Sequence, residues 1–212
     1  MNKKTFGIIL LLGSGWGLVE CGLGAGLKAC AASISGSVMT AAALFFIAAA
    51  WAVGRKAMNI ALLIAVATVF KMFDALLLGL PLRSGAVVHP VFAFVLEGTC
   101  FLAVGAVLAR LMKSAPGRGR LWGGTSALIA AAAFPLVRFA TGIPACVVPG
   151  SMIPLAWAYA PLAVGLSMLA VPLGFKTAEK ARGLAAEPSW RIPAVLVLCL
   201  ALMTIIRAIV PV

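Results

Sequence analysis

The feature that most constrains the fold is a series of seven long apolar segments that take up most of the 212-residue chain. Each approaches the roughly 20 residues that a helix needs to cross about 30 Å of hydrocarbon. Strands of a membrane barrel would alternate polar and apolar residues, whereas these runs are uniformly apolar. They cover residues 6–27, 34–54, 58–79, 89–112, 121–143, 152–175 and 192–211. The pattern predicts an all-α, polytopic transmembrane helix bundle, one domain over 1–212, with about seven spans and six as the alternative.

Prolines cluster around the fifth and sixth segments. Pro161 lies inside the sixth segment and is expected to interrupt it, and Pro135 precedes Arg138 by about one turn and should free the carbonyl of Ala131. Irregular backbone at membrane depth is tolerated mainly where it is buried or lines a cavity. These prolines therefore point to a cavity in the outer half of the protein.

The basic residues predict the orientation. The chain has 17 Lys and Arg against 5 Asp and Glu, a formal charge of +12. With the N-terminus inside, only Lys28 and Arg83 fall in outer loops, and the inner segments hold Lys3, Lys4, Arg55, Lys56, Arg110, Lys113, Arg118, Arg120, Lys176, Lys180, Arg182 and Arg191. Such a bias is typical of a multi-pass protein of the bacterial cytoplasmic membrane, here with an outer C-terminus. It explains the positive charge without a nucleic-acid partner, and it also fits contact with anionic lipid at the inner leaflet.

Six charged residues lie within the predicted spans, where each costs about 2.5 to 3.5 kcal/mol or more at a helix centre. Three are acids and three are bases: Glu20, Asp74, Glu97, Lys71, Arg138 and Arg207. The predicted topology places all six in the outer half of the membrane. Two interpretations follow: they meet around a charge-balanced, hydrated cavity, or they form buried ion pairs that only fix helix register.

The first interpretation predicts a ligand site built from Glu20, Lys71, Asp74, Glu97 and Arg138. A cavity lined by both signs of charge suits a small polar or zwitterionic ligand. His89 lies where the outer loop meets the fourth segment and is expected to cap the entrance or to serve only as a loop residue.

Small residues support close packing around Glu20. Gly13, Gly17 and Gly24 recur at spacings that let a neighbouring helix backbone approach the first span.

The remaining residues predict little other chemistry. The five cysteines show no C-x-x-C spacing and there is one histidine, so no metal and no cofactor are expected. No G-x-S-x-G or phosphate-binding loop motif occurs, which argues against an enzyme and against ATP hydrolysis by this chain. His89 with the carboxylates leaves an enzyme acting on lipid as a remote alternative. Cys30 and Cys146 both fall on the outer side, where a disulfide is chemically permitted.

Four short stretches, "GWGLVE", "SISGSVM", "FKMFD" and "HPVFAFVLEG", resemble a set of small bacterial multispanning membrane proteins. Those proteins are similar in size and hydropathy to the substrate-binding subunits of energy-coupling-factor transporters. The resemblance implies a ligand pocket near the outer face, a partner membrane subunit and two ATPases. The present chain differs in having seven predicted spans rather than six, and glycines, Gly13 and Gly17, where the coupling motif has alanines.

Three functional hypotheses follow. The first is a solute-binding or transport subunit in the lipid bilayer, which binds a small-molecule ligand and is energised by partner proteins. The second is a proton- or ion-coupled carrier that uses the carboxylates of Glu20, Asp74 and Glu97. The third is a non-transporting structural subunit of a membrane complex.

Overall fold

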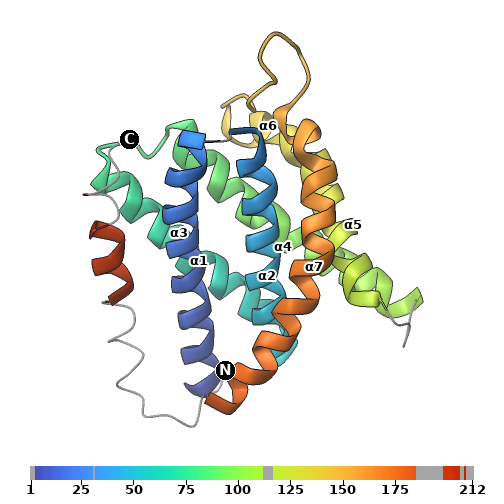
Figure 1. The fold of residues 1–212 in the computed structure, drawn as a ribbon. Helices are drawn as coiled ribbons and strands as arrows, with labels where there is room; N and C mark the ends of the chain where they lie inside the picture. The colour runs from blue at the N-terminus through green and yellow to red at the C-terminus, as the bar shows by residue number, and fades with distance from the viewer. Residues whose placement is uncertain (1–2, 31, 112–116, 185–197, 206–207, 209–212) are drawn as a thin grey trace.

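A computed structural model describes residues 3–30, 32–111, 117–184, 198–205 and 208, without the side chains of 23–33 and 181–184. Long helices dominate these residues, and one isolated antiparallel β-bridge joins Val147 to Pro154. The helices are α1 (Lys3–Cys30), α2 (Ala32–Gly54), α3 (Ala57–Leu77), α4 (Gly85–Leu111), α5 (Arg118–Ala133), the short 3₁₀ helix η1 (Phe134–Leu136), α6 (Val137–Thr141) and α7 (Leu155–Leu184). They pack as the bundle in Figure 1, so the predicted all-α fold is confirmed.

Six stretches of helix in the described residues are long and apolar enough to cross a membrane. They are 3–22, 34–54, 57–77, 85–111, 118–141 and 155–180. They match the first six predicted segments, and the chain is a multi-pass membrane protein. The seventh predicted segment, 192–211, lies mostly outside the described residues. Its described part, 198–205, is helical, and Cys199 and Met203 are buried beside Cys21 of α1 and Phe70 of α3.

The two ends of the bundle differ in charge. Figure 1 places the start of α1, the turn between α2 and α3 and the end of α7 at one end. Exposed basic residues gather there, and we call it the inner end: Lys3, Lys4, Arg55, Lys56, Lys176 and Lys180. The connections 78–84 and 142–154 lie at the opposite, outer end (Figure 1). This separation is the one that the distribution of Lys and Arg predicts.

The prolines act differently in the two predicted segments that they were expected to disturb. Pro135 lies in η1, which ends α5 and turns the chain into the five-residue α6. α7 instead runs through both Pro161 and Pro172 as one helix, so the predicted interruption at Pro161 is wrong. Proline is tolerated within membrane helices because neighbouring groups take up the freed backbone carbonyls.

α1 and α3 pack closely along two matching ridges. A Cβ atom on Gly13 would lie 2.7 Å from Cβ of Val66, and one on Gly17 would overlap Phe70. One turn further on, Cys21 contacts Asp74. Both ridges advance by four residues in the same direction, so α1 and α3 run parallel, as the predicted topology requires. The close approach predicted for Gly13 and Gly17 is confirmed. The surroundings of Gly24 lie outside the described set.

The glycine ridge makes a testable prediction about stability. Gly17→Ala should lower the free energy of unfolding by about 1 to 3 kcal/mol, because the new methyl overlaps the Cβ end of Phe70, which cannot swing aside. Gly22→Ala is the matched control, because a Cβ atom there would meet nothing within 4 Å and alanine favours the helix. Thermal unfolding in detergent measures both. Equal melting temperatures for the two variants would contradict the close α1–α3 contact.

Candidate functional site

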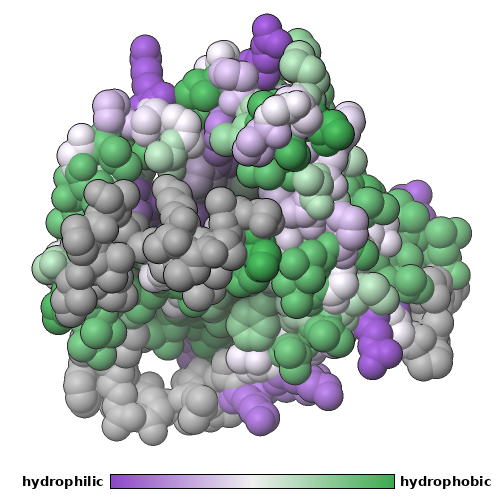
Figure 2. Space-filling view, turned by 45° about the horizontal axis from the view of Figure 1, so that its top comes forward, coloured by the Kyte–Doolittle hydropathy of each residue, from purple (hydrophilic) through white to green (hydrophobic). Residues whose placement is uncertain are grey.

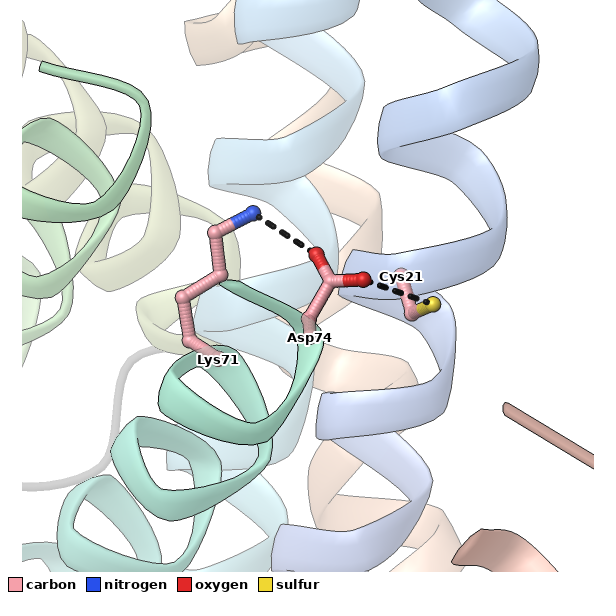
Figure 3. A network of polar contacts seen from close by, with 3 residues as sticks. All are labelled: Cys21, Lys71 and Asp74. Carbon is pink, nitrogen blue, oxygen red and sulfur yellow. Dashed lines mark hydrogen bonds and ion pairs between the residues drawn. The ribbon is translucent and has the colours of Figure 1, made fainter. Parts of the chain in front are cut away.

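Asp74 is the centre of a small polar network between α1 and α3. Its side chain is 2% exposed. Lys71 Nζ donates to Asp74 Oδ2 at 3.4 Å from the same helix, and Cys21 Sγ donates to Oδ1 at 3.5 Å from α1. Figure 3 shows the carboxylate held between these two side chains. Lys71 and Asp74 are three residues apart and share one face of α3, so they form an i,i+3 pair whose two charges offset each other within one turn.

Glu97 forms a second polar centre, in the interior of the bundle. Glu97 lies on α4 and is 5% exposed. Its carboxyl group is hydrogen-bonded to the Thr40 side chain of α2. Glu20 of α1, 8% exposed, lies close enough to interact with it electrostatically. Glu20 and Glu97 are thus within range of electrostatic interaction. Glu20 is followed on α1 by Cys21, which contacts Asp74, so the two polar centres adjoin along this helix.

The depth of Glu97 differs from the sequence prediction. α4 begins at Gly85, four residues before the predicted start, so Glu97 lies about 18 Å along a helix of 27 residues. That is close to the middle of the span rather than clearly in its outer half. The earlier start arises because the Ser84 carbonyl accepts the first amide hydrogen bonds of the helix, from Val87 and Val88.

Two aromatic residues lie about one turn from the acids, Trp16 from Glu20 on α1 and Phe94 from Glu97 on α4. Trp16 is fully buried one turn from Glu20, with its ring centroid 4.6 Å from that of Phe94 on α4. Its indole Nε1 is a buried donor with no partner among the described residues. The i,i+4 spacing of Trp16 and Glu20 in "GWGLVE" was an available signal, because such residues share one face of a helix.

Tyr159 reaches the same region from α7 and interacts electrostatically with Glu97. Two contacts with α2 position Tyr159. Ser37 Oγ donates to the Tyr159 carbonyl at 3.1 Å, and the Tyr159 ring packs directly on Gly36. No sequence spacing could have linked Tyr159 to Glu97, because they lie on helices far apart in the chain.

Arg138 does not join the buried carboxylates. It is exposed on α6, and it forms no ion pair with an acid in the described part of the chain. The prediction that Arg138 faces the interior is therefore wrong. The 3₁₀ turn at Pro135 changes the helix register, so that Val137 is buried and Arg138 faces outward. Arg207 lies outside the described residues.

His89 also lies apart from Glu97, eight residues earlier on α4. Its ring meets Phe134 of η1 edge-on at 6.0 Å, and it is hydrogen-bonded to the backbone of Pro144. His89 thus lies inside α4 rather than in the loop before it, and it ties the start of α4 to the outer connection 142–154. Its role at an entrance stays a prediction. Figure 2 turns this outer end forward and shows hydrophilic residues recessed between more apolar flanks. The outward-open ligand cavity stays a prediction.

Metal chemistry finds no support in the described residues, where no three His, Cys, Asp or Glu side chains gather to hold an ion. Cys146 is a free, exposed thiol, and the Cys30 side chain lies outside the described set. Comparisons with known protein families, curated proteins and solved structures find no match to this chain.

The Lys71–Asp74 pair makes a prediction that separates structure from function. Lys71→Met leaves a buried carboxylate without its ammonium and should destabilise the protein by about 3 kcal/mol, whereas Lys71→Met with Asp74→Leu should recover most of that loss. Arg83→Gln, at an exposed position between α3 and α4, is the control. Unfolding in detergent gives the three values. If the double variant is less stable than Lys71→Met, charge balance between the two residues is not what stabilises this part of the bundle.

Proposed function

We propose that this membrane protein is a solute-binding or transport subunit, and that Glu97 binds the positively charged group of a small polar ligand. The ligand is an organic cation or a zwitterion that presents its ammonium to this carboxylate. The protein acts without catalysing a reaction, in a bacterial cytoplasmic membrane. The same proposal includes the partner membrane subunit and ATPases that the sequence resemblance implies, because no ATP-binding motif occurs in this chain.

The burial of Glu97 is the observation that carries the proposal. A carboxyl group at the middle of a membrane span is costly unless it has a partner or a function. Glu97 has the Thr40 hydroxyl and the negative potential of Glu20 beside it, and no ion pair to a described Lys or Arg. Of the three bases predicted to balance the acids, Lys71 is held by Asp74, Arg138 is exposed, and Arg207 lies outside the described residues.

The surrounding side chains favour a cation over an anion. Aromatic faces attract ammonium groups, and three rings belong to this region: Trp16 and Phe94 contact each other about one turn from Glu20 and Glu97, and Tyr159 interacts electrostatically with Glu97. The indole N–H of Trp16 and the hydroxyl of Thr40 offer hydrogen bonds for polar atoms elsewhere on the ligand. The proposed centre is therefore acidic and aromatic, with Glu97 as the main contact of the ligand's positive charge.

Mass spectrometry of small molecules that copurify with the detergent-extracted protein tests this function. A cation-bearing species should accompany the wild type and be lost from Glu97→Gln and Glu20→Gln. Lys71→Met with Asp74→Leu is the control that should retain it, because the double change removes one charge of each sign and leaves Glu97 and Glu20 in place. All variants must elute as folded protein. Retention of the same species by folded Glu97→Gln and Glu20→Gln would overturn the proposal.

A second candidate, a proton- or ion-coupled carrier, is favoured by the proximity of Glu20 and Glu97. Two neighbouring carboxyl groups in a low-dielectric interior can exchange a proton or small cation for a solute. The purified chain alone, in proteoliposomes, should then take up the copurifying species when a pH gradient is imposed, and Glu97→Gln should abolish the dependence on that gradient. Uptake that requires added partner proteins and ATP would contradict this candidate and favour the first.

A further inference from the structure

A cavity of about 850 Å³ opens at the inner end of the bundle, away from Glu97. It lies between the end of α2, the second half of α4, the start of α5 and the end of α7. In Figure 1 the start of α5 leans away from the end of α7. The volume falls in the range of pockets that bind small molecules. At this level the predicted topology places the headgroups of the inner leaflet.

Aromatic side chains form the apolar wall of this cavity, and packing fixes them in place. Trp122 stacks on Phe101 with ring centroids 4.5 Å apart, and its indole N–H donates to the Phe101 carbonyl at 2.7 Å. Gly105 leaves room for the ring, because a Cβ atom there would overlap it. Trp51 and Phe175 extend the wall, with ring centroids 6.2 and 5.5 Å from that of Trp122. The apolar surface is thus preformed.

Two arginines line the same cavity. Arg118 Cζ lies 5.8 Å from the centroid of Trp122, and its Nε is buried without a hydrogen-bond partner among the described residues. Arg55 has a left-handed backbone with φ of 50°, at the helix end where glycine is usually favoured. The chain therefore accepts backbone strain at a position where an arginine lines the cavity.

One acidic residue, Glu179 of α7, lines the cavity as well. Neither arginine forms an ion pair with it or with any other acid in the described residues. Arginine matches the geometry of phosphate, and a carboxylate matches an amine. The two arginines and Glu179 are therefore complementary to a lipid headgroup that carries both a phosphate and an amine.

We propose that this cavity binds an inner-leaflet glycerophospholipid whose headgroup has an amine beside its phosphate, as in phosphatidylethanolamine. The phosphate lies with Arg55 and Arg118, the amine with Glu179, and the first part of an acyl chain against Trp51, Trp122 and Phe175. The site is independent of Glu97, so it holds whether or not the proposed solute site does.

Native mass spectrometry of the detergent-solubilised full chain measures the binding. The probes are 1-palmitoyl-2-oleoyl phosphatidylethanolamine, the matching phosphatidylglycerol, diacylglycerol without a phosphate, and inorganic phosphate. The wild type should bind phosphatidylethanolamine most tightly and diacylglycerol least. Arg118→Gln should weaken that binding about tenfold, because a charge-assisted hydrogen bond is lost. Glu179→Gln should remove the preference over phosphatidylglycerol.

Two further variants sharpen the test. Ala109→Trp fills the cavity from α4 and should block the acyl chain, whereas Arg120→Gln removes an exposed charge that does not line the cavity and should change nothing. If Ala109→Trp fails to fold, Arg118→Gln decides, since it adds no volume. Equal phosphatidylethanolamine binding by the wild type and folded Arg118→Gln would overturn the proposal. So would full competition by inorganic phosphate, which would indicate a site for free anions, or diacylglycerol binding as tight as that of the phospholipid.

Discussion

The low polarity of the bilayer interior is the constraint on which the rest of this structure depends. Hydrocarbon solvates neither backbone amides nor charged side chains, so the chain must form helices and must place each intramembrane charge against something specific. Asp74 meets this demand within the protein, through Lys71 and Cys21. Glu97 meets it only in part, through the Thr40 hydroxyl. This difference between two buried acids separates a structural contact from a candidate binding group.

Close helix packing creates both environments. On one face of α1, Gly13 and Gly17 let α3 approach until Cys21 reaches Asp74. On an adjacent face, Trp16 contacts Phe94 and thereby sets the spacing between α1 and α4, where Glu20 and Glu97 meet. Consecutive residues of α1 therefore belong to two polar centres with different chemistry. A helix allows this because each residue turns the side chain by about 100°.

The interior of the bundle and its inner end have distinct roles in this view. The interior centre around Glu97 suits a solute, whereas the cavity between Arg55, Arg118 and Glu179 is at the level of lipid headgroups. Both are lined by aromatic rings, which provide a face for a cation in one case and a wall for an acyl chain in the other. Trp51 and Trp122, which lie at the predicted inner boundary of their spans, are part of this wall.

The sequence by itself determined the fold class, the first six spans and the charge difference between the two ends, because these depend on segment length, uniform hydropathy and the count of Lys and Arg. The i,i+3 spacing of Lys71 and Asp74 on one helix is also visible in the sequence, and the structure shows the contact that this spacing allows. Only the tertiary structure decided which other charges meet. Glu97 gains Glu20, Thr40 and Tyr159 from three other helices, and a 3₁₀ turn at Pro135 directs Arg138 away from them. Such contacts depend on how each helix is rotated about its axis, and a uniformly apolar span carries little information about that rotation.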